Sequence, residues 1–269
     1  MSTTIAIALG GNLGNVPETF DRALHSLTDH PGIQLIRRSR NFRTRAIGSQ
    51  AGDDYINAAA LLQVHCTPQV LLNGLQQIEA DCGRTRTLHW GPRTLDLDLL
   101  RFGDVQMVEH GPGREQNGNR GETDRPNPQQ TESGSLIVPH PACWYRRFVL
   151  DPWYEIDPEW NHPLLRETVR EMRGRLVSRP IRVLITGPLA RTNQLSAGLQ
   201  RTFSSREIGI VPASSPREIE FHVDEENPLE NPPPRSVFLD GPDMRETATQ
   251  ILRAMLDVPQ PIGGVEARN

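Results

Sequence analysis

The sequence predicts an α+β fold, and three observations support this prediction. Apolar runs of strand length lie at residues 3–9, 33–42, 55–64 and 94–100. Two stretches between them place apolar side chains at helical spacing, one beginning near Pro17 and the other at Pro68. Taken in chain order, these elements give β-α-β-β-α-β, which is the split pattern of a ferredoxin-like α/β sandwich with a mostly antiparallel sheet.

The ends of the two helices follow from individual residues. The first helix carries an apolar face from Phe20 to Leu27. The second begins after Thr67, an N-cap hydroxyl that precedes proline, and Gly83 ends it. Residues 41–54, between the second and third strands, are polar and contain glycine, so we predict a mobile loop there.

The first strand leads into Gly10-Gly11-Asn12-Leu13-Gly14. Glycine-rich turns between a strand and a helix often hold phosphate groups. The spacing here differs from the dinucleotide pattern G-x-G-x-x-G, because Asn12 stands where the second glycine belongs. From the residues alone, a plain tight turn is the simpler interpretation.

Two acidic residues, Asp96 and Asp98, alternate with leucines on the fourth strand, so both carboxylates project from one face. Neighbouring anions repel each other, and a cation is expected between them. It is either an arginine, such as Arg93, or Mg²⁺, which takes one or two carboxylates together with substrate phosphates. Carboxylates, metal and arginines together suit phosphoryl transfer. The Asp-x-Asp pair is short, however, and a solvated surface strand also accommodates it.

Composition excludes several function classes. The chain has 29 basic and 33 acidic residues and a net charge of −4, which argues against a nucleic-acid or membrane surface. It contains no lysine, so a Walker A loop and Schiff-base chemistry are excluded. We find neither a long apolar run nor a basic leader, and expect a cytoplasmic protein. Three scattered cysteines fit reduced thiols better than a disulfide framework or a zinc site.

A longer string, GPRTLDLD with Trp90 before it, resembles the signature of the 6-hydroxymethyl-7,8-dihydropterin pyrophosphokinase family. Other pieces follow in the family's order: ALGGNLGN, FRTRAIG, DYINAA, VPHP and RRFVLDPWYEIDP. The resemblance runs from about Ile5 to Leu176. It implies a ferredoxin-like fold, ATP and hydroxymethyl-dihydropterin as substrates, AMP as a product, and a role in folate synthesis.

The resemblance also assigns roles to residues. It implies that Asp96 and Asp98 hold two Mg²⁺ ions, and that Arg84 and Arg93 are catalytic. Pterin is expected at Thr44, Ile47, Tyr55, Asn57, Trp90 and Phe148. ATP is expected at Gln76, Glu79, Arg86, His140 and Arg146. The chain departs from relatives at Arg45 and Ala46, where proline is common, and at Ser135, Ile137 and Pro141, where some relatives carry Arg, Thr and Tyr.

Two segments fall outside the resemblance. Residues 109–134 contain no apolar residue of the set AVILMFWYC and are predicted to be a disordered insertion. Residues 179–269 read as a small α/β module that follows a domain of residues 1–178, and we expect the two to fold separately. Two other functions stay open: another Mg-dependent nucleotidyl or phosphoryl transferase, and a nucleotide-sensing module without turnover.

Overall fold

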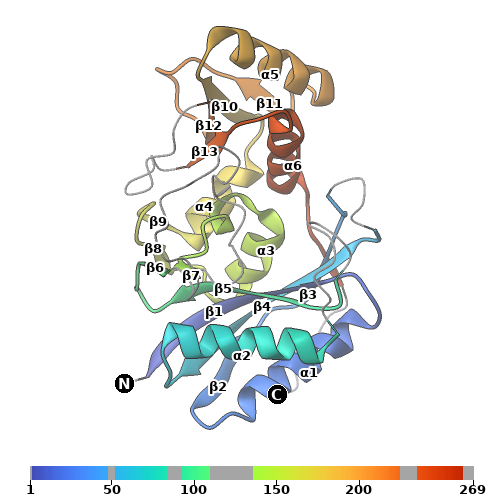
Figure 1. Cartoon of the computed structure of the whole chain (residues 1–269), viewed down its shortest axis with the longest axis vertical. Coiled ribbons are helices and arrows are strands. Elements are labelled where there is room, and N and C mark those ends of the chain that lie inside the picture. The colour runs from blue at the N-terminus through green and yellow to red at the C-terminus, as the bar shows by residue number, and fades with distance from the viewer. Residues whose placement is uncertain (1, 48–51, 84–92, 110–135, 225–234, 263–269) are drawn as a thin grey trace, which may run out of the picture.

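The computed structural model describes residues 2–47, 52–83, 93–109, 136–224 and 235–262. In the N-terminal sheet the strand order is β14-β3-β4-β1-β5, and β2 also pairs with β4 (Figure 1). Its strands are β1 (Thr3–Gly11), β2 (Ile33–Arg38), β3 (Asn41–Thr44), β4 (Tyr55–Val64), β5 (Asp96–Phe102) and β14 (Gln260–Ile262). The pairs between these strands are antiparallel. The predicted α+β class with a mostly antiparallel sheet is therefore confirmed.

Two strands, β2 and β3, replace the single strand predicted over residues 33–42. Strand β2 pairs with one half of β4, and β3 pairs with the other half. Between them the hydroxyl of Ser39 accepts the backbone N–H of Ala59 at 2.9 Å, and the Ser39 N–H donates to the Ala59 carbonyl. The prediction of a loop over residues 41–54 is wrong for residues 41–44, which form β3. Taken as one interrupted strand, β2 and β3 complete the ferredoxin-like order with β4, β1 and β5.

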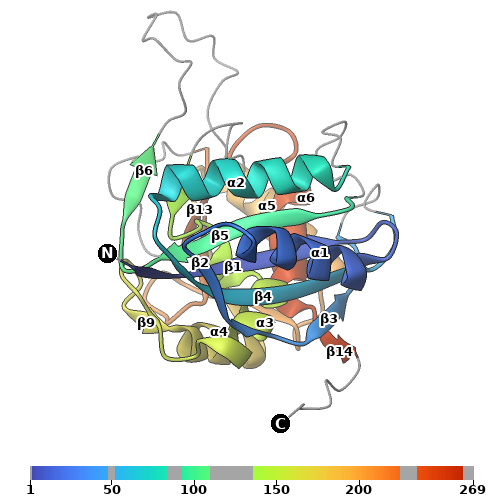
Figure 2. The same cartoon turned by 90° about the horizontal axis from the view of Figure 1, so that it is seen from below.

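Helices α1 (Val16–Thr28) and α2 (Pro68–Asp81) cover one face of this sheet (Figure 2). Phe20 and Leu75, both fully buried, represent the apolar faces that pack onto alternate residues of β1 and β4. The predicted start of α2 is confirmed, because the Thr67 hydroxyl accepts the N–H of Val70. This face holds the first core cluster of the molecule.

The opposite face is covered by α3 (Arg147–Ile156). Before it come β6 (Met107–Glu109), β7 (Leu136–Val138) and the 3₁₀ turn η1 (Cys143–Tyr145). Small residues on the sheet, Ala6 and Ala59, pack in one cluster with Leu150 and Trp153 of α3. Glu109, the first residue of the predicted insertion, belongs to β6, and residues 110–134 lie outside the described residues.

The last helix of the N-terminal unit, α4, begins at a defined cap. Helix α4 spans Val169–Val177, and β8 (Asn161–His162) pairs with β9 (Glu167–Thr168) just before it. Thr168 and Glu171 form a capping box, in which each side chain bonds to the other residue's backbone N–H. This cap fixes the first turn of α4.

The C-terminal unit contains a parallel sheet with the order β11-β10-β12-β13. Its strands are β10 (Ile181–Thr186), β11 (Ile208–Ile210), β12 (Ile219–Val223) and β13 (Ser236–Leu239). Helices α5 (Leu189–Thr202) and α6 (Met244–Leu256) contact each other and this sheet. The unit therefore contains a small α/β module, the class predicted for residues 179–269.

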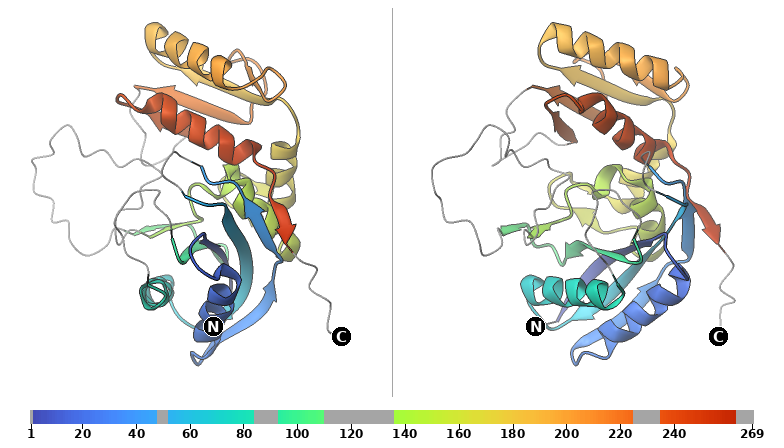
Figure 3. Two further views of the ribbon diagram at one scale, coloured as in Figure 1. Left: turned by 90° about the vertical axis from the view of Figure 1, so that its right-hand side faces the viewer. Right: turned by 45° about the vertical axis from the view of Figure 1, so that its right-hand side comes forward.

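The two units share a hydrophobic core, whereas the sequence predicted that they fold separately. Helix α6 contacts α3, α4 and η1 as well as β13, and Figure 3 shows it between the two sheets. Buried Leu252 and Met255 of α6 belong to the same cluster as Trp153 and Leu176. After α6 the chain returns to the N-terminal sheet as β14. Strand β14, which follows the boundary predicted at residues 178/179, therefore belongs to the N-terminal sheet.

The three cysteines are free. Cys143 is buried, and this burial raises the pKa of its thiol to about 12, so the thiol stays protonated. Cys66 and Cys82 are half-buried, and burial also raises the pKa of both. Among the described residues, no helix combines the length and apolar character that crossing a membrane requires.

Candidate active site

The floor of the candidate site is formed by two rows of residues across the N-terminal sheet. In the first row Gly10 of β1 pairs with Asn57 of β4 and with Asp96 of β5. In the second row Ala8 pairs with Asp98. Because residues two apart on a strand share a face, both carboxylates project on the side of Asn57. A Cβ at Gly10 would lie 3.4 Å from Asn57 Oδ1 and 3.8 Å from Asp96 Cβ, so glycine keeps this space open.

Asn12, in the turn after β1, joins three segments. Its N–H donates to the carbonyl of Arg93 at 2.9 Å, and its Oδ1 accepts the N–H of Arg93 at 2.8 Å. Its Nδ2 donates to the carbonyl of Asp53 at 3.1 Å. At the preceding Gly11 a Cβ would lie 2.7 Å from the carbonyl oxygen of Thr94, so the close approach requires glycine. Asn12 thus holds the segments before β4 and β5 against the end of β1.

Arg93 neutralises part of the acidic charge of the site. Its Nη1 lies 2.6 Å from Asp96 Oδ2. Burial opposes the charged form of Arg93, but Asp96, Tyr55 and Asp98 outweigh burial and its pKa is raised. Burial raises the pKa of Tyr55, an effect that Arg93 opposes and Asp96 adds to. At neutral pH the site therefore presents an arginine cation and an un-ionised phenol beside the carboxylates.

His140, in the turn after β7, lies next to the second carboxylate. Its Nε2 is 4.0 Å from Asp98 Oδ2, and its Nδ1 accepts the N–H of Ala142 at 3.1 Å. Because Nδ1 accepts a hydrogen bond, the neutral ring carries its proton on Nε2, toward Asp98. Burial lowers the pKa of His140 to about 4, while Asp98 acts in the opposite direction and Arg146 in the same one. The ring is therefore a neutral donor at physiological pH.

Asp96 and Asp98 are suited to hold a divalent cation together with a ligand. Their side chains are 23% and 35% exposed, so carboxylate oxygens are accessible from the site. Among the residues that the structure describes, no group of three or more His, Cys, Asp or Glu side chains is placed to hold a metal ion. Proteins commonly bind Mg²⁺ through a pair of carboxylates, and waters and substrate phosphates are its other ligands. The carboxylates of Asp96 and Asp98 therefore fit a metal ion that binds together with a phosphate group.

Asn57 and Thr44 form the polar group at the other end of the floor. Both are buried, and Asn57 Nδ2 donates to Thr44 Oγ1 at 2.8 Å. This bond fixes the rotation of the amide and leaves Oδ1 on the side of Gly10. Tyr55 pairs with Thr44 across the same two strands. Three of the predicted pterin-binding residues are thus neighbours.

Glu79, predicted to bind ATP, is 4% exposed on α2 and contacts the strand of the acidic residues. Its Oε1 accepts the backbone N–H of Leu97 at 2.7 Å, between Asp96 and Asp98. Gln76 lies one turn earlier on α2 and is half-buried. The structure gives Glu79 a role in supporting β5, and the predicted contact of Glu79 and Gln76 with the nucleotide stays a prediction.

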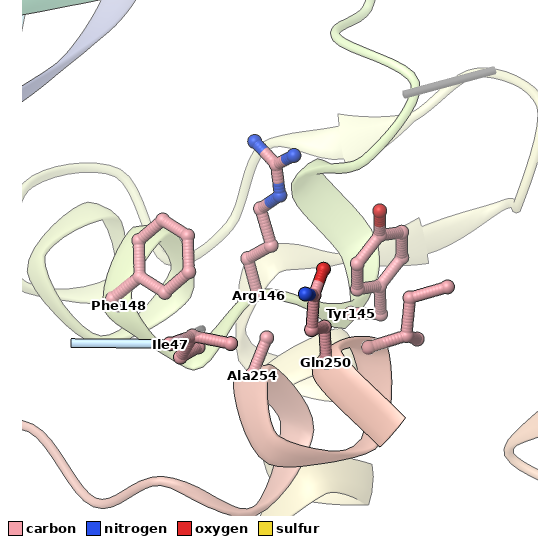
Figure 4. Close-up of a pocket in the computed structure, with 7 residues that line it drawn as sticks. Ile47, Tyr145, Arg146, Phe148, Gln250 and Ala254 are labelled. Atoms are coloured by element: carbon pink, nitrogen blue, oxygen red, sulfur yellow. The ribbon is translucent and has the colours of Figure 1, made fainter. Parts of the chain in front are cut away.

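A pocket opens between the N-terminal unit and α6 (Figure 4). It is lined by Ile47, Tyr145, Arg146, Phe148, Gln250, Ile251 and Ala254. The guanidinium carbon of Arg146 lies 5.7 Å from the ring centroid of Phe148 and 5.8 Å from that of Tyr145, so the cation is held between two aromatic faces. Three predicted site residues, Ile47, Arg146 and Phe148, therefore meet here with a helix outside the resemblance.

Three predicted site residues, Arg84, Arg86 and Trp90, lie outside the described residues. Sequence reasoning missed two features of the site. One is the joining role of Asn12, although an asparagine where a glycine pattern fails is itself a sign of side-chain bonding to turn backbone. The other is the wall formed by α6, which no motif in the sequence indicates.

The chain is similar to known proteins in sequence and in fold. A sequence profile of 7,8-dihydro-6-hydroxymethylpterin-pyrophosphokinase (HPPK) matches residues 6–158. The chain is 37% identical over 166 residues to 2-amino-4-hydroxy-6-hydroxymethyldihydropteridine pyrophosphokinase of Synechocystis, a match that covers 62% of this chain and 72% of that protein. It is 33% identical over 156 residues to the protein of that name from Bacillus subtilis, with 58% and 79% covered.

Among solved structures, a triple mutant of Plasmodium falciparum HPPK-DHPS is similar in fold, with a TM-score of 0.50 and 12% identity. That match covers 95% of this chain and 60% of the other. The profile match spans more than half of the chain and includes Asn12, the Asp96–Asp98 strand and residues 146–148 at the start of α3. The chain belongs to the HPPK family.

Proposed function

We propose that the chain transfers the pyrophosphoryl group of ATP to the hydroxymethyl group of 6-hydroxymethyl-7,8-dihydropterin, in folate biosynthesis. The observation that carries this proposal is the placement of Asp96 and Asp98 beside Arg93, in line with the Asn57–Thr44 pair across Gly10. The acidic pair, which can bind metal, lies at one end of the floor and suits a phosphorylated substrate. The fixed amide lies at the other end and suits a flat heterocycle.

The amide end of the floor suits a pterin. The buried Asn57 amide, oriented by Thr44, offers a fixed acceptor and donor to a ring that carries amide-like edges. Tyr55, un-ionised, and Phe148 supply aromatic faces, and Ile47 an apolar contact. Trp90 is proposed as a further aromatic contact, on the basis of the resemblance alone.

The acidic end suits the triphosphate. Asp96 and Asp98 are proposed to hold two Mg²⁺ ions, which neutralise phosphate charge and lower the barrier to displacement when bound. Arg93, fixed by Asp96 and by the backbone bonds to Asn12, is placed to stabilise charge on the transferring group, together with Arg84. Neutral His140 is placed to donate a hydrogen bond from Nε2 to the triphosphate, and Arg146 adds a cation near the His140 ring. Gln76, Glu79 and Arg86 are proposed to contact the nucleotide.

The proposed reaction is a displacement at the β-phosphorus of ATP. The hydroxymethyl oxygen of the pterin attacks the β-phosphorus of ATP, the bond from that phosphorus to the α,β-bridging oxygen breaks, and AMP leaves. The hydroxyl proton is released, and the products are the pterin diphosphate and AMP. The chain's own contribution is to hold both substrates in line, since positioning and charge neutralisation dominate this chemistry.

An AMP-release assay tests the proposal. We expect AMP to form from ATP in the presence of Mg²⁺ and 6-hydroxymethyl-7,8-dihydropterin, in equal amount to the pterin diphosphate. Omission of the pterin should abolish AMP formation. Pterin-independent AMP or ADP release would point to another phosphoryl or nucleotidyl transferase, and nucleotide binding without product would point to a sensing module.

A further inference from the structure

The strand β14 ties the end of the chain to the strand that leads into the pterin site. Gln260 pairs with Arg43, and Ile262 pairs with Asn41 of β3. The next residue along β3, Thr44, is the one that orients the Asn57 amide. Without β14 the strand β3 would be an open edge of the sheet, and edge strands lose their pairing more readily than inner ones.

A second contact holds the chain just after β3. Asp257, the residue that follows α6, is half-buried, and its carboxylate faces the backbone amides of Val258 and Arg45. This contact therefore restrains the backbone just after β3 from outside that segment.

The pocket in Figure 4 provides the third contact. Gln250 and Ala254 of α6 line the same space as Ile47, Arg146 and Phe148. Ala254 is 5% exposed, while Gln250 is half-buried with its amide toward the pocket (Figure 4). Helix α6 thus contacts both the segment after β3 and the start of α3, where Arg146 and Phe148 lie.

We propose that α6 and β14 are positioning elements of the substrate site. They hold the segment Arg45–Ile47 on one side and Arg146–Phe148 on the other at the spacing that the pterin requires, and Gln250 and Asp257 are the positioning residues. This inference rests on the proposed function, because the pterin is the ligand that both segments serve. It gives the C-terminal unit a role in the same reaction rather than one of its own.

The first test compares two tryptophan variants of the full chain. In Gln250→Trp an indole at the pocket pushes against Ile47 and Arg146, so we expect KM for hydroxymethyl-dihydropterin to rise about tenfold, since small displacements in a site have large effects. The melting temperature should stay within about 2 °C of the wild type, because the position is half-exposed. Arg253→Trp, at an exposed position on the same helix, should keep the wild-type KM.

A second pair of variants decides the matter if the indole disrupts folding. Asp257→Asn keeps an oxygen that can accept from the Arg45 amide, and Asp257→Ala removes it. We expect Asp257→Ala alone to raise KM for the pterin and to speed hydrogen exchange at residues 45–47 by about tenfold. A purely structural role would lower the melting temperature of Asp257→Ala and leave KM unchanged.

The inference is overturned if Gln250→Trp and Asp257→Ala, both folded, match the wild type in KM, or if exchange at residues 45–47 is equal in Asp257→Ala and Asp257→Asn. A folded wild-type chain that releases no AMP contradicts the proposed function instead. In that case the exchange measurement, which needs no turnover, still decides whether α6 and β14 hold these segments.

Discussion

The buried carboxylate of Glu79 accepts the backbone N–H of Leu97 at 2.7 Å. Strand β5 is at the edge of the N-terminal sheet, so its outward N–H groups need partners other than a strand. Leu97 lies between Asp96 and Asp98, and the bond therefore connects α2 to the backbone that carries both carboxylates. The position of the acidic pair is set from outside the sheet as well as within it.

Glu79→Ala should leave this N–H without an acceptor and lower the free energy of unfolding by about 1–3 kcal/mol. Glu79→Gln keeps an acceptor oxygen and should cost clearly less. Urea unfolding measures both, with Gln77→Ala, an exposed change on the same helix, as the control. If Glu79 served only the nucleotide, both variants would unfold like the wild type and differ from it only in KM for ATP.

Asn12→Ala should lower kcat/KM by about a hundredfold, because it removes side-chain bonds to Arg93 and Asp53 and frees the segments before β4 and β5. Asn12→Asp keeps the acceptor for the Arg93 N–H and loses only the donor to Asp53. Its kcat/KM should therefore lie between that of the wild type and that of Asn12→Ala. Steady-state kinetics with both substrates varied provides the comparison. Equal kcat/KM in Asn12→Ala and wild type would show that these bonds do not position the site.

Much of this site was predictable from the sequence, for physical reasons that differ between residues. Alternation along a strand is a local property, so the shared face of Asp96 and Asp98 followed directly. The partner of Glu79 did not, because a buried carboxylate on a helix gives no sign of which backbone N–H it accepts. The break at Ser39 was missed for a similar reason: its bonds to Ala59 join residues twenty apart.

The return of the chain as β14 was the largest omission. Gln260-Pro261-Ile262 has neither the length nor the apolar alternation of an ordinary strand, and its proline is tolerated because β14 lies at the sheet edge. Helix α6 carries an apolar stripe in its sequence, but a stripe does not show that two sides of a helix are covered by different units. Separate folding was expected for that reason.

The structure predicts that the two units do not separate. A chain ending at Arg179 lacks α6 and β14 and uncovers apolar residues of α3, α4 and η1, so we expect it to aggregate or to melt well below the full chain. A chain ending at Ile262 retains every described element and should behave like the full chain. Size-exclusion chromatography and thermal unfolding make the comparison. A soluble and fully active chain ending at Arg179 would contradict the shared core.

His162 predicts a pH dependence of stability. Burial lowers its pKa from 6.5 to about 4, and its Nδ1 accepts the N–H groups of Leu164 and Leu165. The unfolded chain therefore binds a proton between pH 6.5 and about 4 that the folded chain does not, and stability falls as pH decreases through this window. The loss amounts to about 3 kcal/mol once the pH is below 4.

The measurement is the unfolding free energy of the wild type and of His162→Asn from pH 4 to pH 8. The wild type should lose stability below pH 6.5 more steeply than His162→Asn, which has no titrating ring. His30→Asn, at an exposed position, should keep the wild-type slope. Parallel curves for wild type and His162→Asn would show that the ring does not titrate with unfolding.

The most direct test of the central claim is pterin-dependent AMP release by the wild type, Asp96→Asn and Asp98→Asn, each confirmed as folded by its thermal unfolding. Each substitution removes an anionic ligand from the site that neutralises the phosphates, so we expect turnover to fall by about a thousandfold or more. The wild type should form AMP and pterin diphosphate in equal amounts only when ATP, Mg²⁺ and hydroxymethyl-dihydropterin are all present. Near-normal turnover in both variants, or AMP release by the wild type without the pterin, would contradict the account.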